Sequence, residues 1–428
     1  MSRIAIVSEH ASPVAQAGGV DSGGQNIYVA QVARRLARLG HGVDVFTRMD
    51  NPSLPLEMEW DEGVKIVHVP AGPAHETPKE ALLPYMDAFS AFMHGYFSGR
   101  DEPYDLIHAN FFMSAHASLP VAHRYGIPLA VTFHALGRVR RRYQAEADRF
   151  PDSRFSIEDH VVHHADCIIA ECPQDRQDLL ELYGADPAKI RTVPCGYDPQ
   201  EMWPMDRQEA RRALGGPEDG FQILQLGRMV PRKGVDNVIL ALGLLRRQYG
   251  VDARLCVVGG ESEQPSPRDT PELGRLIGLA QEAGVREFVT FTGRRRREVL
   301  RRYYGASDVF VTTPWYEPFG ITPLEAMACA RPVVGADTGG IRHTVVDGVT
   351  GLLVPPRRPE ALAAALARMA RQPERARAMG QEGAKRAARY FTWSRVGAQL
   401  DAIFEELCGE PVPGLSLPAP FPSIQLPM

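Results

Sequence analysis

QILQLGRMVPRKG, residues 222–234, is the stretch of this chain that decides its fold. It begins with a short apolar run, residues 222–226, which is typical of a buried strand. A loop with a glycine at each end follows, and a longer helical pattern comes after it. A strand, a glycine-containing loop and a helix in this order predict the beginning of a doubly wound α/β domain.

The first half begins in the same way, with an apolar run at Arg3–Ser8, a glycine-rich loop at 18–26 and a helical pattern at Gln25–Leu39. Short apolar runs then alternate with longer amphipathic segments, which is typical of βαβ units. The further strands that we expect are Val43–Thr47, Val64–Val69, Leu106–Ala109, Leu129–Phe133, Cys167–Ala170, Ile190–Val193, Arg254–Val258, Phe288–Phe291, Val309–Thr312, Pro332–Gly335 and Gly351–Val354. The sequence therefore predicts two doubly wound parallel-sheet, Rossmann-like domains. Because such sheets bind ligands beyond the carboxyl ends of their strands, we expect a site in a cleft between the two domains.

The segment Tyr197–Pro204 has two prolines and no periodicity, which indicates a linker. We place an N-terminal domain at residues 1–200 and a C-terminal domain at residues 205–392. Further helices are expected at Pro84–Phe97, Pro373–Tyr390 and Trp393–Leu407. Residues 411–428 are rich in proline and almost uncharged, which predicts a disordered tail.

The composition is that of an ordinary globular chain, with 428 residues of which 44% are apolar and 23% charged. A net charge of −4 gives no general attraction to nucleic acid. No stretch approaches the length of a membrane span, and the N-terminal apolar run is too short for a signal peptide. The six cysteines have no zinc-binding spacing. We therefore expect a soluble, cytoplasmic protein with reduced thiols.

The glycine-rich loop before residue 26 would let the backbone approach a ligand, and the N–H groups at the start of the next helix favour an anion. We expect a phosphate or a sugar to lie against Gly24. An ordinary flexible loop is the alternative. The glycines lack the Gly-x-Gly-x-x-Gly spacing of a dinucleotide-binding turn, which weighs against an NAD-dependent oxidoreductase.

Two basic residues, Arg228 and Lys233, follow the strand at 222–226. They can converge on one diphosphate, the guanidinium as a planar fork and the ammonium as a point charge. Neutralising a leaving diphosphate is the main task in breaking a sugar–nucleotide bond. A solvated basic loop is the alternative, and the position directly after a strand favours the functional interpretation.

Two carboxylates, Glu317 and Glu325, bracket a turn and a helix start after the strand Val309–Thr312. Glu325 can bind a vicinal diol such as ribose, and Glu317 can bind sugar hydroxyls. The backbone N–H groups that would point at a phosphate or sugar belong to Phe319, Gly320 and Ile321. Two surface glutamates are the alternative, but Glu beside Pro-Phe-Gly is unusual for a surface.

Two other strand ends carry candidates. His134 follows Leu129–Phe133, at the expected edge of the cleft, and a structural histidine is the alternative. Gly339 and Gly340 follow the strand Pro332–Gly335 and permit close approach of the backbone to a ligand. A simple strand-to-helix turn accounts for these two glycines equally well.

Taken in order, the glycine loop, the strand-end histidine, Arg-x4-Lys and Glu-x7-Glu resemble the retaining glycosyltransferases with two Rossmann domains, the GT-B fold of the family 4 type. The resemblance covers residues 3–408 and is strongest to the branch of sucrose-phosphate synthases, sucrose synthases and the inositol-phosphate N-acetylglucosaminyltransferase. It implies that the last helix, residues 393–408, crosses back onto the N-terminal domain.

The resemblance also implies roles for the donor-side residues. Arg228 and Lys233 would hold the donor diphosphate. Glu325 would bind the ribose, and Glu317 would hold the transferred sugar together with the backbone of Phe319 and Gly320.

The remaining implied roles concern the sugar, the base and the mechanism. His134 would contact the transferred sugar, with its carbonyl beside the developing positive charge, and Arg294 would contact the base through its backbone. The implied mechanism is front-face substitution, in which the departing phosphate oxygen accepts the acceptor's proton. No metal or other cofactor is expected, and the sequence has no Asp-x-Asp signature.

For the acceptor, relatives that act on sugar phosphates use the glycine loop, a lysine and basic residues after the strand-end histidine. The matching candidates in this chain are Gln25, Asn26, Lys79, Arg138 and Arg142. The family member that acts on inositol phosphate has tyrosine and threonine where this chain has Phe111 and Ala135. These two differences would remove two phosphate hydrogen bonds, which weighs against inositol phosphate.

We therefore expect a retaining hexosyltransferase that moves glucose or N-acetylglucosamine from a UDP-sugar to a small polyol or sugar phosphate. The alternative is a GDP-mannose enzyme with a lipid or polysaccharide acceptor, in which the arginines at 294–302 contact anionic headgroups at the membrane periphery. A non-catalytic sugar-nucleotide-binding protein is a third possibility. The complete set of candidates at 228, 233, 317 and 325 weighs against it.

Overall fold

The structure, a computed structural model, describes residues 1–14, 23–217 and 219–409. These residues form two compact units. Unit 1 contains residues 1–14, 23–194 and 393–409, and unit 2 contains residues 195–217 and 219–392. Most of the predicted glycine loop, up to residue 22, and the predicted tail at 411–428 lie outside the described residues.

The described part of unit 1 is built on an eight-stranded sheet in the order β3-β4-β2-β1-β5-β6-β7-β8. Strand β3 is antiparallel to β4, and the other neighbouring pairs are parallel. The strands are β1 (Arg3–Val7), β2 (Gly42–Arg48), β3 (Glu57–Asp61), β4 (Val64–Val69), β5 (Leu106–Asn110), β6 (Leu129–Thr132), β7 (Cys167–Ala170) and β8 (Ile190–Thr192). The direction of winding reverses between β1 and β5, which makes their carboxyl ends the switch point of this sheet.

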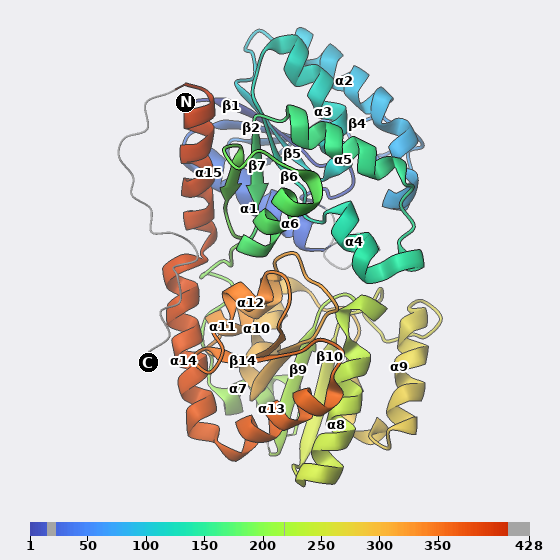
Figure 1. The fold of residues 1–428 in the computed structure, drawn as a ribbon, viewed down its shortest axis with the longest axis vertical. Helices are drawn as coiled ribbons and strands as arrows, with labels where there is room; N and C mark the ends of the chain where they lie inside the picture. Colours follow the sequence, from blue (N-terminus) through green and yellow to red (C-terminus); the bar gives the residue numbers. More distant parts are fainter. Residues whose placement is uncertain (15–22, 218, 410–428) are drawn as a thin grey trace. The chain divides into compact units, whose positions relative to one another are not determined.

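Helices cover the sheet of unit 1 (Figure 1). They are α1 (Gly24–Arg38), α2 (Met86–Ser98), α3 (Phe112–Tyr125), α4 (Gly137–Gln144), α5 (Ser153–His164), α6 (Pro173–Tyr183) and α15 (Trp393–Leu407), with short 3-10 turns η1 (Lys79–Ala81), η2 (Leu83–Tyr85) and η3 (Ala145–Ala147). Although α15 comes last in the chain, it packs beside α1, and the rings of Trp393 and Tyr28 lie 5.9 Å apart.

The described part of unit 2 has a six-stranded parallel sheet in the order β11-β10-β9-β12-β13-β14. Its strands are β9 (Phe221–Leu226), β10 (Ala253–Val258), β11 (Val289–Phe291), β12 (Val309–Thr312), β13 (Val333–Ala336) and β14 (Gly351–Val354). Its helices are α7 (Arg207–Leu214), α8 (Val235–Tyr249), α9 (Pro271–Glu282), α10 (Arg297–Ala306), α11 (Ile321–Ala328), α12 (Ile341–Thr344), α13 (Pro359–Arg371) and α14 (Pro373–Tyr390), with 3-10 turns η4 (Pro231–Lys233) and η5 (Arg286–Phe288). The switch point of this sheet lies between β9 and β12.

These two sheets confirm the predicted fold class, two doubly wound α/β domains. The segment predicted as a linker, Tyr197–Pro204, packs within unit 2. Tyr197 donates its N–H to the carbonyl of Phe391 over 2.9 Å, and Glu201 forms an ion pair with Arg297. The chain passes between the units at residues 194–195 and again at 392–393.

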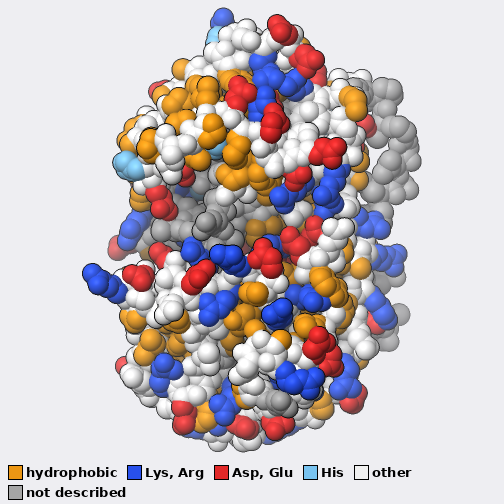
Figure 2. Space-filling view, turned by 180° about the vertical axis from the view of Figure 1, so that it is seen from behind, with side chains coloured by type: hydrophobic (Ala, Val, Ile, Leu, Met, Phe, Trp, Pro, Cys, Tyr) orange, Lys and Arg blue, Asp and Glu red, His pale blue; other side chains and the backbone are white. Residues whose placement is uncertain are grey.

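The surface of the described chain fits the sequence-based charge argument. On the face that Figure 2 shows, Lys and Arg side chains are interspersed with Asp and Glu, and no field of a single sign dominates it. Within the described residues, no helix is both long enough and apolar enough to cross a membrane.

Candidate active site

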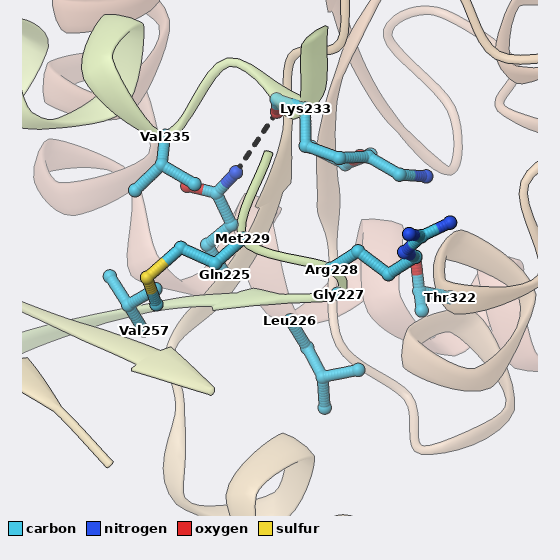
Figure 3. A pocket seen from close by; sticks show the side chains of 10 residues that line it. Gln225, Leu226, Gly227, Arg228, Met229, Lys233, Val235, Val257 and Thr322 are labelled. Atoms are coloured by element: carbon cyan, nitrogen blue, oxygen red, sulfur yellow. Dashed lines mark hydrogen bonds between the residues drawn. The ribbon is translucent and has the colours of Figure 1, made fainter. Parts of the chain in front are cut away.

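A pocket opens at the switch point of unit 2, where β9 and β12 end (Figure 3). Its lining comes from β9 and the loop after it, from η4, from the carboxyl ends of β10 and β12, and from the starts of α8 and α11. The lining residues are Gln225, Leu226, Gly227, Arg228, Met229, Lys233, Val235, Val257, Thr312 and Thr322. Two of the sequence-predicted residues, Arg228 and Lys233, thus share one pocket at the position where such sheets bind ligands.

The loop after β9 aims both basic side chains in the same direction, and their charged ends lie next to one another in Figure 3. Lys233 ends the turn η4, and its carbonyl accepts a hydrogen bond from Gln225 Nε2 over 3.1 Å. Gly234 then takes a φ of 69°, and a Cβ at this position would lie 2.0 Å from the carbonyl oxygen of Thr313. Only glycine fits here. Its close contact with Thr313, directly after β12, fixes the backbone position of the preceding residue, Lys233.

Lys233 also forms an ion pair with Glu317, whose side chain is 15% exposed. Burial lowers the pKa of the Lys233 ammonium, and the charge of Glu317 partly offsets this effect. Burial acts to raise the pKa of Glu317, but the charges of Lys233 and Arg232 outweigh it, and the pKa lies below the usual value. The lowered pKa of Glu317 favours its carboxylate form, and an ammonium paired with it keeps further N–H donors for a ligand oxygen.

The loop that carries Glu317 is held from both sides. The N–H of Trp315 donates to the carbonyl of Arg232 over 2.9 Å, which joins it to the Lys233 turn. On the other side, the N–H of Gly340 donates to the carbonyl of Glu317 over 3.0 Å, and a Cβ on Gly339 would lie 1.9 Å from that same oxygen. The sequence analysis expected a ligand to approach the backbone of Gly339 and Gly340 closely. In the structure the Glu317 loop makes this close approach, and the two glycines support that loop.

Phe319, Gly320 and Ile321 lie at the start of α11, where the sequence analysis placed backbone donors. Gly320 has a φ of 95° and directly precedes the helix. The Phe319 side chain is buried, and its ring lies 6.3 Å from that of Phe391. The first N–H groups of α11 have no partner within the helix, and this is the geometry that suits an anionic or hydroxylated ligand.

Glu325 lies inside α11 and is only 1% exposed. Arg297 Nη1 donates to its Oε1 over 2.8 Å, and the Tyr304 hydroxyl donates to its Oε2 over 2.8 Å. Arg297 also pairs with Glu201, so that one guanidinium joins two carboxylates. Glu325 is thus anchored to α10 in this structure. Each of its oxygens accepts one of these bonds and can accept a second.

The basic run at 294–302 is largely engaged within unit 2. Arg294 donates its N–H to the carbonyl of Ser262 over 2.7 Å, and its own carbonyl accepts from Arg295 over 2.8 Å. Arg301 lies 3.5 Å above the ring of Trp203. Arg296, by contrast, is 84% exposed.

Unit 1 gathers a second set of polar side chains at the carboxyl ends of its strands. His134 follows β6, with Nδ1 3.1 Å from Glu171 Oε1 and Nε2 3.0 Å from Asn110 Oδ1. Its ring meets that of Tyr28 at 4.7 Å, edge to face. Its φ is 58°, in the left-handed region that residues other than glycine rarely adopt. Gln25 Nε2 donates to Ser8 Oγ and to the carbonyl of Asn110, each over 3.2 Å, which links both sides of the switch point.

The other acceptor candidates of unit 1 differ in their surroundings. Asn26 is buried, and its side chain joins the backbone of Gly23 to that of Ser12. Arg138 is paired with Asp159, the atoms Nη2 and Oδ2 lying 2.7 Å apart. Lys79 lies in η1, whose next residue, Glu80, approaches Arg140 of α4 at 3.7 Å, and Arg142 of α4 is exposed.

The two positions that weighed against inositol phosphate are also ordered. Phe111 is buried with a φ of 87°, and its ring packs on those of Phe112 and Phe150. The carbonyl of Ala135 accepts a hydrogen bond from the Arg154 guanidinium. That guanidinium lies 4.6 to 5.0 Å from the same three phenyl rings.

Sequence reasoning missed several residues at these sites. Asn110 and Glu171 are polar residues at or directly after strand ends, and the rule that selected His134 could have found them. Arg154 lies in the first turn of α5 and Glu158 one turn later, and a basic and an acidic residue four apart in a helix give no signal beyond an ordinary surface pair.

Comparisons with known proteins assign the family. A model of the glycosyl transferases group 1 matches residues 206–386, and one of glycosyltransferase family 4 matches residues 22–201. The chain is 39% identical to the D-inositol 3-phosphate glycosyltransferase of Actinosynnema mirum over 94% of this chain and 97% of the relative. It is 38% identical to the protein of that name from Kineococcus radiotolerans, over 94% of each chain.

Solved structures agree. The chain superposes on sucrose-phosphate synthase from Thermosynechococcus elongatus with a TM-score of 0.88 and 33% identity, over 96% of this chain and all of that one. The fold is also that of Anabaena HepE, solved in complex with UDP and glucose, with a TM-score of 0.73 and 19% identity over 95% of this chain and 100% of that one. This chain therefore belongs to the GT-B glycosyltransferases of the group 1 and family 4 type.

Proposed function

We propose that this chain is a retaining, metal-independent hexosyltransferase that transfers a hexose from a UDP-sugar to a phosphorylated polyol or sugar. UDP-glucose and UDP-N-acetylglucosamine are the donors that we propose. The observation that carries the proposal is the partly buried Lys233–Glu317 pair beside Arg228 at the switch point of unit 2. Two neighbouring cations suit a diphosphate and an adjacent carboxylate suits sugar hydroxyls, which supports the proposal.

On the donor side, Arg228 and Lys233 bind the diphosphate and stabilise the charge that grows on it as the bond to the sugar breaks. Glu317 accepts hydrogen bonds from hydroxyls of the transferred sugar. The backbone at the start of α11 (Phe319, Gly320 and Ile321) and that of Gly24 at the start of α1 contribute N–H donors.

For the nucleoside, Glu325 binds the ribose through its remaining acceptor positions, and the backbone of Arg294 contacts the base. In this arrangement Arg297 and Tyr304 orient the Glu325 carboxylate. Glu325→Ala would break both of these contacts, whereas Glu325→Gln can keep the one from Arg297 through its amide oxygen, so Glu325→Gln is the better variant for testing the ribose contact.

On the acceptor side, unit 1 supplies Gln25, Asn26, Lys79, Arg138 and Arg142, and His134 contacts the transferred sugar. The names of the relatives support a phosphorylated acceptor, since they refer to inositol 3-phosphate and to sucrose phosphate. These names include both a polyol phosphate and a sugar phosphate, and transfer assays with each acceptor distinguish the two.

The proposed mechanism is front-face substitution. The bond from the anomeric carbon to the diphosphate oxygen breaks, the acceptor hydroxyl forms its bond on the same face, and its proton passes to the departing phosphate oxygen. The configuration at the anomeric carbon is thereby kept. Two side-chain cations can neutralise the leaving group, and for this reason no metal ion is invoked.

The GDP-mannose and lipid alternative has less support. In that alternative the arginines at 294–302 would contact lipid headgroups. In the structure, however, Arg297 is bonded to two carboxylates and Arg301 covers the ring of Trp203. These contacts leave a smaller cationic surface than the sequence suggested.

A panel of UDP-, GDP- and ADP-sugars in a thermal-shift assay tests the donor, followed by transfer assays with inositol phosphate, glucose phosphate and fructose phosphate. A ligand at 100 times its dissociation constant stabilises the folded chain by about 2.7 kcal/mol. The proposal expects UDP-sugars to raise Tm most, a phosphorylated acceptor to be glycosylated, and EDTA to leave turnover unchanged. A selective response to GDP-mannose, or activity that EDTA abolishes, would contradict it.

A further inference from the structure

The loop after the strained His134 runs through residues 135–136 into the first turn of α4 at Gly137 and Arg138, and side chains from α5 and α6 hold the backbone of residues 135–138. Glu158 of α5 is fully buried, and both its oxygens accept from the N–H of Gly137, each over 3.0 Å. Arg154, one turn earlier, donates from Nε to Glu158 Oε1 over 2.7 Å and from Nη2 to the carbonyl of Ala135. The loop is therefore bonded through both a carbonyl and an N–H group.

Tyr183 of α6 completes the arrangement. Its hydroxyl accepts from the N–H of Arg138 over 2.9 Å and donates to Glu158 Oε2 over 2.5 Å. An N–H can only donate and a carboxylate can only accept, and this defines the direction of both bonds. Burial, and then the charge of Glu158, raises the pKa of Tyr183, which keeps the hydroxyl protonated as a donor.

Steric fit adds a further constraint at Gly137. A Cβ there would lie 2.7 Å from Glu158 Oε2 and 2.8 Å from Arg154 Nε. The φ of Gly137 is not in the left-handed region, so close contact with these two side chains, and not backbone strain, accounts for glycine at this position.

A buried ion pair contributes little net stability compared with apolar side chains of similar size, but it can specify one conformation. Four of the bonds described above end on the backbone of residues 135–138, and the other two join Glu158 to Arg154 and to Tyr183. We propose that Arg154, Glu158 and Tyr183 are positioning residues, a clamp that fixes the backbone of residues 134–138 and with it the orientation of the His134 carbonyl. Its consequence for turnover rests on the proposed function, whereas its consequence for the loop does not.

Tyr183→Phe is the most informative variant, because it removes both hydroxyl bonds and keeps the ring. The clamp predicts faster amide hydrogen exchange in peptides covering residues 134–138. It also predicts at least a tenfold lower kcat, with the Kd for UDP unchanged within twofold because none of the residues proposed to bind UDP lies within 134–138. Tyr125→Phe is the matched control, since that hydroxyl donates to the carbonyl of His94 elsewhere in unit 1. It should change neither the exchange at 134–138 nor kcat.

Glu158→Gln provides a second variant of equal size should Tyr183→Phe fold poorly. Its amide NH2 group cannot accept a bond, so at least one of the contacts to Gly137 and Tyr183 is lost, and the same faster exchange and lower kcat are expected. The proposal is overturned by a folded variant with unchanged exchange and unchanged kcat, or by a loss of UDP affinity equal to the loss of kcat. If the wild-type chain transfers no sugar from any donor, the proposed function fails, but exchange at 134–138 still decides whether the clamp exists.

Discussion

At the residue scale, the charged side chains of unit 2 are defined as much by their neighbours as by their own chemistry. Lys233 is paired with Glu317, and its backbone is held by Gln225 and Gly234. The sequence predicted Arg228, Lys233 and Glu317 as candidates because each follows a strand. It could not predict the pairing itself, since the two partners are separated by several elements and meet only when β9 and β12 become neighbours.

The first prediction concerns Arg228 and Lys233. If both stabilise the charge that develops on the leaving diphosphate, replacing the two by alanine should lower kcat by more than a hundredfold, about 2.7 kcal/mol or more in activation free energy. Steady-state kinetics with UDP-glucose would separate kcat from KM. A loss confined to donor KM would mean that the two residues only anchor the substrate.

The second prediction concerns Asp175, in the first turn of α6 beside the loop of Glu171. Burial, and then the charge of Glu171, raises the pKa of Asp175 to about 8 from the ordinary value of 3.8. Between these values the folded chain binds more protons than the unfolded chain, and the free energy of unfolding falls as the pH rises. Asp175→Asn removes this penalty.

Its gain in Tm should therefore be larger at pH 8 than at pH 5, by at least about 2 °C. Differential scanning calorimetry at the two pH values measures this difference. Asp101→Asn, at an exposed position, is the control and should show no such dependence. An equal Tm change for Asp175→Asn at both pH values would mean that its carboxyl is ionised in the folded chain.

At the scale of elements, the order of the strands brings the candidate residues together. Periodicity predicted the ranges of β4, β7, β12, β14, α14 and α15 as the structure has them, because each is a continuous apolar or amphipathic run. Strand β3 was missed. Its residues, Glu57–Asp61, alternate charged and apolar side chains at the sheet edge, and it is stabilised by antiparallel pairing with β4, including an ion pair from Lys65 to Glu57.

The third prediction belongs to the turn between β13 and α12. Gly339 has a φ of 48°, and a Cβ there would lie 1.9 Å from the carbonyl oxygen of Glu317, whereas Gly348 has a φ of 73° with open space around it. Both substitutions by alanine should cost about 1–2 kcal/mol for the left-handed backbone. Only Gly339→Ala should also displace the Glu317 loop.

Gly339→Ala is therefore expected to raise donor KM or lower kcat at least tenfold, and Gly348→Ala to keep wild-type kinetics while losing some stability. Kinetics and chemical denaturation of the two variants, measured side by side, separate strain from displacement. Equal kinetics in both variants would show that Gly339 does not support the Glu317 loop.

At the scale of the whole molecule, each of the two units has its own switch point with polar side chains around it. The sequence predicted this organisation because the strand–loop–helix pattern restarts in the second half. It did not predict that residues 195–204 pack in unit 2, since proline content alone cannot distinguish an ordered connection from a free one. Family membership and fold follow from the comparisons, and the stereochemistry of transfer is the central claim of the proposal.

The measurement that tests this claim most directly is proton NMR of the first product formed from UDP-glucose and a phosphorylated acceptor. The donor has the α configuration, and front-face substitution predicts an α-linked product, recognised by a small coupling between H1 and H2. A β-linked product, with a large coupling, would contradict the account, because it requires attack from the opposite face and a base that accepts the proton there.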